Sequence, residues 1–572
     1  NFRFNMKKQT IKVFAFLAIV GSMATGCQLL KDVEYKATPD PLEMHGDAVR
    51  VSVEITFPEK GIKKKAAAEI TPMLGNTALK SIRVQGEKAT GNGEAILYKA
   101  GGKVTYEDVV PYTPDMETAD LMITGKIFKG EKEKGEIEAT KIADATIITP
   151  YLVNKDFKVV LAKDEFRRVT QENLLTVINF DKGRDVVKYS ELKDDDVSTM
   201  EAFMADAQTN PRVAVTGINV VGYASPEGEV DKNEGLSDDR AASAIKSAMK
   251  VAKKAGHEQA SEESTYNASG SGEDFPGFKR ELQADTEMDE SDKQLVLRIL
   301  ETEKNPAARE QKMRDLGKSF TYLDRNIFPK LRRTEININY DLTGFSDEEL
   351  KANSVSNSDT LNLEELLFCA TLYDDLNEKL RVYRIAEERY PNDYRTSNNV
   401  GAVLYMLNKV SEAKAKFEKA NSTKDNVISK NNLGAIAGLE GDRTKAMDLL
   451  NQSGGAGTEV DYNKGILDIQ NGEYANAITH LGADASFNLA LAHLLNGNTT
   501  GSVETVNGSV DASTAQGYYF KAVAAARQGK ADGVLSNLKS AIKADGAYKA
   551  KAANDREFIK WMNDPAFTSV VK

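Results

Sequence analysis

The stretch Asn399-Val400-Gly401-Ala402 recurs as Asn432-Leu433-Gly434-Ala435, at an offset of 33 residues. Apolar positions recur with the same spacing and then once more at an offset of 31: Ala413 and Ala446, Phe417 and Leu450, and finally Gly465, Ala477 and Leu481. Self-similarity of this length indicates helical hairpins stacked in a row. Small residues let two helices approach each other, and we expect the large apolar residue to fill the groove of the next unit.

Residues 363–572 therefore resemble tetratricopeptide repeats, with five or six degenerate units over about 180 residues. The stretch Asp555–Val571, which contains Trp561 and Phe567, is expected to cap the last unit. The resemblance implies an α-helical solenoid whose concave groove recruits an unidentified protein partner.

Composition and charge narrow the function classes. The 572 residues are enough for three or four domains, and 75 Lys and Arg against 86 Asp and Glu give a net charge of −11. An acidic chain argues against a general nucleic-acid binder, which needs a basic face. Two cysteines and four histidines are too few for a disulfide framework or a thiolate zinc site.

The N-terminal stretch is predicted to be a targeting signal. Basic residues after Met6 precede the apolar run Val13–Ala24, which is too short to span a bilayer as a helix. The run ends in Ala24-Thr25-Gly26-Cys27, which resembles the bacterial lipobox. We therefore predict a signal peptide over residues 1–26, acylation of Cys27, and a lipidated tether over residues 27–35. An ordinary signal peptide with a chance cysteine is the alternative.

Residues 36–170 are predicted to form a β-sandwich. Val49–Phe57 alternates apolar and polar residues over nine positions, and further short strands, including Phe157–Leu161, are separated by turn residues. The cluster Lys63-Lys64-Lys65 has two interpretations, a grip for an anionic polymer or headgroup, or the solvated start of a strand.

Residues 171–345 are predicted to form an α+β domain. The pattern gives strands at Leu174–Phe180 and Arg212–Tyr223, a helix opening at Ser237, and a closing strand that ends at Tyr340. An insertion over about 255–327 begins with a polar loop, 257–274, and continues with two helices.

Two motifs in this domain, Gly222–Gly228 (GYASPEG) and Asn233–Ala241 (NEGLSDDRA), resemble the peptidoglycan-associated, OmpA C-terminal-like family. The resemblance implies that Arg240 holds a carboxylate of the diaminopimelate stem of peptidoglycan. Ser225 stands where the family has an aspartate, so the ammonium partner is missing, and Glu227 is a candidate substitute. Asn233 is expected to shape the loop. Alternatively, Arg240 pairs with a neighbouring carboxylate such as Asp238 or Asp239.

The polar stretch 346–362 is predicted to be a linker. It contains Asp359-Thr360-Leu361, which resembles a short O-glycosylation motif of Bacteroidota and makes Thr360 a candidate site. No nucleophile, nucleotide-binding or metalloprotease motif occurs, so the sequence predicts no enzyme, no cofactor and no metal site.

Together these patterns favour a Bacteroidota outer-membrane lipoprotein that is tethered to peptidoglycan and scaffolds a protein partner. It would face the periplasm, with display on the cell surface left open. The alternative is an accessory subunit of an outer-membrane or cell-surface assembly in which the central domain only docks protein.

Overall fold

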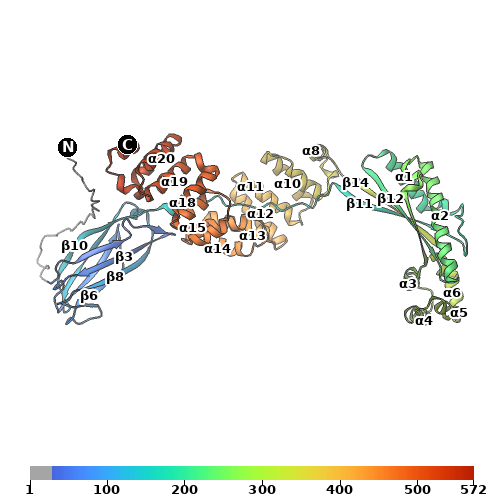
Figure 1. The fold of residues 1–572 in the computed structure, drawn as a ribbon, viewed down its shortest axis with the longest axis horizontal. Helices are drawn as coiled ribbons and strands as arrows, with labels where there is room; N and C mark the ends of the chain where they lie inside the picture. The colour runs from blue at the N-terminus through green and yellow to red at the C-terminus, as the bar shows by residue number, and fades with distance from the viewer. Residues whose placement is uncertain (1–28) are drawn as a thin grey trace, which may run out of the picture. The chain divides into compact units, whose positions relative to one another are not determined.

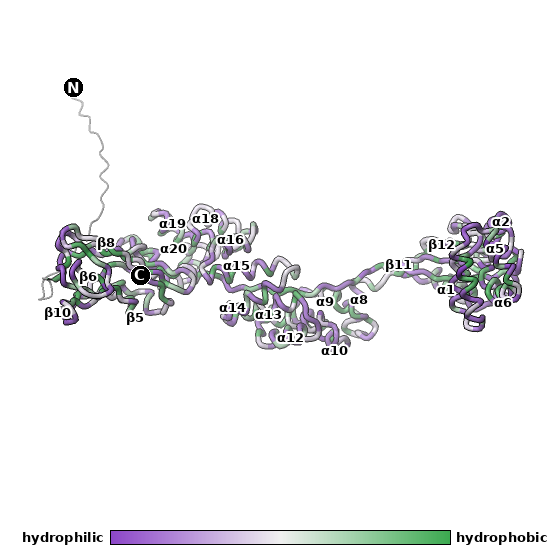
Figure 2. Tube along the Cα trace, turned by 90° about the horizontal axis from the view of Figure 1, so that it is seen from below, coloured by the Kyte–Doolittle hydropathy of each residue, from purple (hydrophilic) through white to green (hydrophobic). Residues whose placement is uncertain are grey.

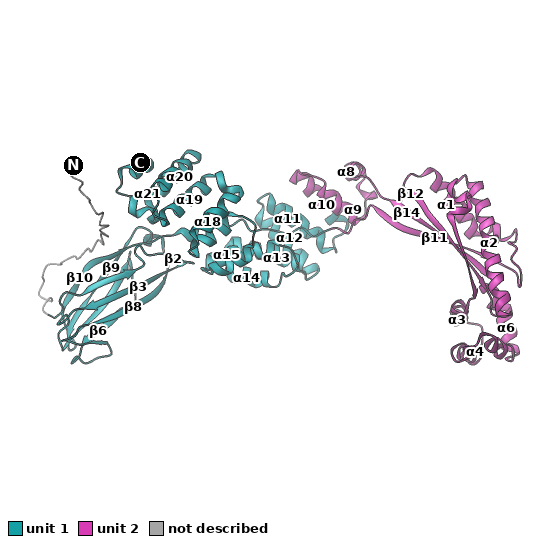
Figure 3. Ribbon diagram, in the orientation of Figure 1, with its two compact units in different colours: residues 1–163, 386–572 teal, residues 164–385 magenta. Residues whose placement is uncertain are grey.

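The computed structural model describes residues 29–572, so the predicted signal peptide over 1–26 and the predicted acylation site Cys27 lie outside the described residues. The chain divides into two compact units (Figure 3). One unit combines residues up to 163 with residues 386–572, and the other comprises residues 164–385. The N-terminal and C-terminal parts of the chain thus fold together, with the central part inserted between them in sequence.

The sheet-rich N-terminal region expected from the sequence is present as two sheets. One sheet contains β1 (Glu34–Thr38), β2 (Met44–His45), β3 (Ala48–Phe57) and β8 (Gly102–Pro111). The other has the order β10 (Lys132–Asp144), β9 (Asp120–Lys129), β4 (Ala66–Leu74), β6 (Ile82–Gly86) and β7 (Glu94–Ile96), with β5 (Thr77–Ala78) beside β4. Alternate residues of β3 are buried and share one core with Ile70 and Ile123 of the facing sheet. Hydrophilic and hydrophobic residues mingle along these strands in Figure 2.

The strand expected at Phe157–Leu161 does not form. After β10 and the short 3₁₀ helix η2 (Thr149–Leu152), residues 153–163 are extended without any strand partner. Their alternation of apolar and polar residues has a different cause, described below.

The central unit contains a mixed four-stranded sheet of order β11-β14-β12-β13, and only the β12–β13 pair is parallel. The elements follow as β11 (Val169–Asn179), α1 (Asp195–Thr209), β12 (Val213–Ala224), α2 (Val230–Ala255), β13 (Tyr266–Glu273) and β14 (Arg333–Thr343). The helix expected to open at Ser237 starts seven residues earlier. Ser237 is fully buried inside α2, where its hydroxyl donates to the carbonyl of Glu234.

Three segments of this unit differ from expectation. The predicted loop 257–274 contains β13, a mostly exposed edge strand without the apolar alternation that would reveal it. The insertion forms five helices around a small core, namely α3 (Phe275–Ala284), α4 (Glu290–Thr302), α5 (Pro306–Arg314), α6 (Lys318–Asn326) and α7 (Phe328–Leu331). The expected linker contains α8 (Asp347–Ser356), because Ser346 and Glu349 form a capping box and Leu350 is buried. Two further helices, α9 (Leu363–Thr371) and α10 (Leu376–Arg389), follow.

The C-terminal region has the expected tetratricopeptide-like architecture (Figure 1). Consecutive helices pair as α11 (Tyr394–Met406) with α12 (Val410–Thr423), α13 (Val427–Glu440) with α14 (Arg443–Asn451), α15 (Glu459–Asn471) with α16 (Tyr474–Leu481), α17 (Phe487–Leu495) with α18 (Thr499–Gly508), and α19 (Ala515–Arg527) with α20 (Ala531–Ala544). The helices α21 (Ala547–Asn554) and α22 (Pro565–Val571) close the chain.

Close packing within each repeat explains the recurring glycines. A Cβ atom added at Gly401 would lie 2.8 Å from the ring of Phe417, and one at Gly465 would lie 2.5 Å from Leu481. The large residue therefore contacts the glycine of its own hairpin, whereas we expected it in the groove of the next unit. Among the described residues, no helix is long and apolar enough to cross a membrane.

Candidate functional site

The segment 152–162, which we call the strap and which is extended from Val153 onward, runs along the first helices of successive repeats. Four asparagines at equivalent places in α11, α13, α15 and α17 each form two hydrogen bonds with one strap residue. In every pair the asparagine Oδ1 accepts from the strap N–H and Nδ2 donates to the carbonyl of the same residue. The pairs, with the two distances, are Asn399 with Ala162 (2.7 and 2.9 Å), Asn432 with Val160 (2.7 and 2.9 Å), Asn463 with Lys158 (2.7 and 2.8 Å) and Asn488 with Asn154 (2.8 and 2.9 Å).

The spacing of three contacts matches the two-residue period of an extended chain. Alternate residues of such a chain face the same side, and the asparagines hold residues 158, 160 and 162. The fourth contact, at Asn154, lies four residues before Lys158. On the solenoid, each successive asparagine comes from the next repeat. All eight bonds go to main-chain atoms, so the asparagines recognise an extended backbone.

A second row of amides completes the network. Asn398 and Asn431 donate to the carbonyls of Val160 and Lys158, at 3.1 and 3.2 Å. Neighbouring repeats are also joined, because Asn432 donates to Asn398 at 3.0 Å and Asn463 donates to Asn431 at 3.1 Å. These amides are essentially inaccessible to solvent, and their mutual bonding satisfies groups that would otherwise be costly to bury.

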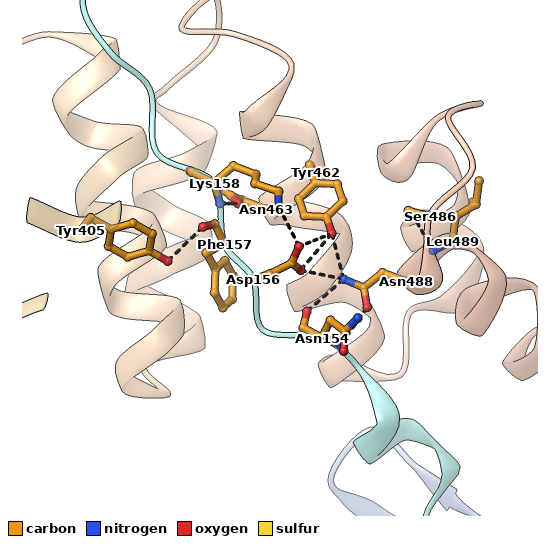
Figure 4. A network of polar contacts seen from close by, with 10 residues as sticks. All are labelled: Asn154, Asp156, Phe157, Lys158, Tyr405, Tyr462, Asn463, Ser486, Asn488 and Leu489. Carbon is orange, nitrogen blue, oxygen red and sulfur yellow. Dashed lines mark hydrogen bonds and ion pairs between the residues drawn. The ribbon is translucent and has the colours of Figure 1, made fainter. Parts of the chain in front are cut away.

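Side chains of the strap add apolar and charged contacts (Figure 4). Phe157 is buried against Gly438, where a Cβ atom would lie 2.6 Å from its ring, and the carbonyl of Phe157 accepts from the Tyr405 hydroxyl at 2.9 Å. The Tyr462 hydroxyl donates to Asp156 at 2.9 Å. Burial first, and then the negative charge of Asp156, raise the pKa of Tyr462, so this phenol stays protonated and remains a donor.

Further contacts join the sandwich to the repeats within the same unit. The N–H of Gly46 donates to the Tyr474 hydroxyl at 3.3 Å, and Arg443 pairs with Asp47. At the cap, Glu557 accepts from the Thr149 hydroxyl at 2.5 Å and pairs with Arg527. The strap thus connects two regions that also touch directly.

The sequence contained a signal for this site that we did not interpret. Asn399 and Asn432 belong to the repeated stretch, and Asn431 directly precedes Asn432. Asn463 and Asn488 occupy the equivalent position in later repeats, among small and apolar residues of buried helices. A recurring asparagine on a buried helix face needs a partner, because an unpaired buried amide is costly. Its partner could not be identified from spacing, since the strap lies more than two hundred residues earlier.

The residues of the predicted peptidoglycan site lie together in the central unit, around the end of β12 and the start of α2. Arg240 is 1% exposed, and its guanidinium donates to three main-chain carbonyls: Arg184 at 2.9 Å, Tyr223 at 2.7 Å and Asp181 at 3.1 Å. Burial lowers the pKa of Arg240 to about 10, so the group remains charged at neutral pH. Asp238 and Asp239 do not accept from it; Arg240 instead holds the loop after β11.

The other predicted residues surround a second arginine. Arg332 donates to the Ser225 hydroxyl at 3.3 Å and forms an ion pair with Glu227 at 2.7 Å, both partners being nearly inaccessible. Asn233 donates to the carbonyl of Ser225 at 3.2 Å. No sequence motif placed Arg332 in this cluster. Its position directly before the closing strand was the available signal.

Two further predictions concern other places. Thr360 is exposed at the end of a 3₁₀ turn, and its hydroxyl donates to the carbonyl of Asn357 at 2.8 Å. Its glycosylation stays a prediction. Within residues 29–572, no group of three or more potential ligands is placed to hold a metal ion.

Fold and groove together define a tetratricopeptide-like repeat protein whose concave surface binds an extended segment of its own chain. No known protein family and no curated protein matches the sequence. Among solved structures, the chain is similar to the Cut9–Hcn1 hetero-tetramer of APC/C, at 12% identity and a TM-score of 0.32, covering 40% of this chain and 45% of that one. It is also similar to YrrB, a TPR protein with an unusual peptide-binding site, at 18% identity and a TM-score of 0.25, covering 30% and 97%. A tetratricopeptide repeat protein from Parabacteroides merdae gives 14% identity and a TM-score of 0.27, covering 39% and 89%.

Proposed function

We propose that this protein is a non-catalytic scaffold of the bacterial cell envelope, anchored to the outer membrane through acyl chains on Cys27. In this proposal the strap fixes the sandwich to the repeats, and the central domain docks a protein partner. The observation that carries the proposal is the filled groove: four bidentate asparagine pairs at 2.7–2.9 Å hold the strap.

A filled groove changes where partners are expected. The strap occupies the first helices of four successive repeats. A peptide partner would therefore have to displace the eight bonds of the bidentate pairs, the two bonds from Asn398 and Asn431, and the buried Phe157 ring. With the strap in place, the repeats offer partners only their other surfaces. Such an arrangement suits a scaffold better than a receptor for free peptides.

The contacts of Arg240 favour protein docking over wall binding. Three main-chain carbonyls already accept from its guanidinium, and Glu227, the candidate substitute for the missing aspartate, is paired with Arg332. A wall tether of the OmpA-like kind would need both groups turned toward the diaminopimelate stem. That tether remains the second candidate, because the motif Asn233–Ala241 is intact.

Two measurements test the proposal. The acylated full-length protein, solubilised in mild detergent, is centrifuged with purified peptidoglycan sacculi; we expect it to stay in the supernatant. Retention on the sacculi would support the wall tether instead. Separately, a labelled peptide of residues 152–162 is titrated into the intact protein. We expect no binding, and saturable binding would show that the groove is open to peptides and would overturn the scaffold proposal.

A further inference from the structure

One end of the sandwich gathers the start of the described chain and several loops. The N–H of Lys63 donates to the carbonyl of Leu29 at 3.0 Å, and the N–H of Lys31 donates to Gly61 at 2.8 Å. The N–H of Lys60 donates to the carbonyl of Tyr98 at 2.7 Å. Main-chain hydrogen bonds therefore fix these loops to one another. We call this surface the lysine end; it comprises residues 29–34, 58–65, 86–94, 97–103 and 129–134.

The lysine end lies opposite the end that contacts the repeats. β3 begins at Ala48, two residues after Gly46, which bonds to Tyr474 of the repeats. It finishes at Phe57, beside the lysine end. Ten residues of strand span about 33 Å, so the sandwich separates the lysine end from the repeats by roughly that length.

The charge of the lysine end is opposite to that of the whole chain. Its segments hold eleven lysines and seven acidic residues, an excess of four positive charges, whereas the chain carries −11. Three of its lysines form ion pairs with neighbouring carboxylates: Lys64 with Glu87 at 3.0 Å, Lys60 with Glu59 at 3.2 Å and Lys31 with Asp32 at 3.8 Å. Lys63 and Lys65 are exposed.

Apolar and aromatic groups accompany these charges. Leu97 is 55% exposed at the start of the turn 98–100. The ammonium groups of Lys63 and Lys64 lie 5.6 and 5.4 Å from the centre of the Tyr98 ring. An exposed leucine beside a tyrosine and long basic side chains is the combination that suits the boundary between lipid headgroups and acyl chains.

We infer that the lysine end rests on a membrane surface that contains anionic phospholipids. This inference rests on the proposed acylation of Cys27, because only Gln28 separates Cys27 from Leu29 and two residue steps span at most about 7 Å. An acyl anchor at that position brings the lysine end to the headgroups, where lysines are attracted to anionic lipid. The repeats are then held away from the bilayer by the length of the sandwich.

The test uses the acylated full-length protein reconstituted into phosphatidylethanolamine vesicles with or without phosphatidylglycerol. A polarity-sensitive dye is attached to Leu97→Cys or to the matched control Val109→Cys. Val109 is 58% exposed but lies toward the other end of β8. The native Cys369 is fully buried, so the dye should react with the introduced cysteine. With phosphatidylglycerol present, we expect iodide quenching of the dye at 97 to fall several-fold, and quenching at 109 to stay unchanged.

Charge reversal separates headgroup attraction from simple tethering. The pair Lys63→Glu and Lys65→Glu should restore quenching at 97, whereas the control pair Lys543→Glu and Lys549→Glu, on exposed residues near the C-terminus, should not. Equal quenching at 97 and 109 in acylated protein would overturn this inference but not the proposed acyl anchor. Shielding of the dye at 97 that depends neither on phosphatidylglycerol nor on Lys63 and Lys65 would have the same consequence. The mass of the N-terminal peptide reports acylation separately, and its absence would overturn both the anchor and this inference.

Discussion

Replacing Asn432 by alanine tests whether the asparagine pairs hold the strap. The substitution removes the bonds of Asn432 to the N–H and carbonyl of Val160, its bond to Asn398 and the bond that it accepts from Asn431. The carbonyl keeps a donor, because Asn398 also bonds to it at 3.1 Å, but the N–H loses its only acceptor in the groove. One orphaned amide costs about 1–3 kcal/mol and the lost bonds about 1 kcal/mol, so we expect a loss of about 2–4 kcal/mol.

Amide hydrogen exchange measures the loss of stability at the Val160 N–H, the group that loses its hydrogen bond to Asn432. A loss of about 2–4 kcal/mol should speed exchange of the Val160 N–H at least roughly 30-fold and lower the urea midpoint of the first unit. The matched control is Asn476→Ala, an exposed asparagine of α16, which should change stability by less than about 0.5 kcal/mol. Unchanged exchange at Val160, with the urea midpoint of the wild type, would refute the role assigned to the asparagines.

Three other substitutions test the repeats and the central unit. Gly465→Ala places a Cβ atom 2.5 Å from Leu481 and should cost about 1–3 kcal/mol in urea unfolding; wild-type stability would contradict the close approach. Burial acts to raise the pKa of Glu387, but hydrogen bonds from two lysines of α12 and from Ser397 outweigh it and lower that pKa. Its stabilising effect is therefore present above the unfolded value of 4.5 and is lost as the pH falls below it, so Glu387→Gln should flatten the acid side of the stability curve. Arg240→Lys keeps the charge, but one ammonium nitrogen cannot take the place of the three guanidinium nitrogens that bond to three separate carbonyls. Thermal unfolding should therefore occur at lower temperature, and an unchanged midpoint would argue against its loop-holding role.

Local patterns predicted the elements whose residues share one periodicity. β3 alternates because one of its faces is buried. The 33-residue repeat is visible because a small residue on the first helix of each hairpin packs against a large apolar residue on the second. β13 and α8 were missed for the opposite reason. β13 is an exposed edge strand without apolar alternation, and α8 depends on a capping box in a stretch whose composition is typical of linkers.

For the cluster around Arg240 and Arg332, the sequence likewise predicted some features and left others to the tertiary structure. Ser225, Glu227, Asn233 and Arg240 were singled out by their motifs, and they do lie close together. Which group each one contacts depended on atoms supplied from elsewhere. Arg332 comes from the far side of the insertion, and two of the three carbonyls that accept from Arg240, those of Asp181 and Arg184, belong to a loop without any distinctive sequence.

By itself, the sequence determined the kinds of structure: strands first, then strands and helices in alternation, then repeated helical hairpins. It also placed an asparagine at the same position of successive repeats. Only the tertiary structure decided that these asparagines bind residues 152–162 of the same chain. The physical reason is that bidentate amides recognise main-chain atoms, which every residue carries alike, so no side-chain pattern in the strap could reveal its partner.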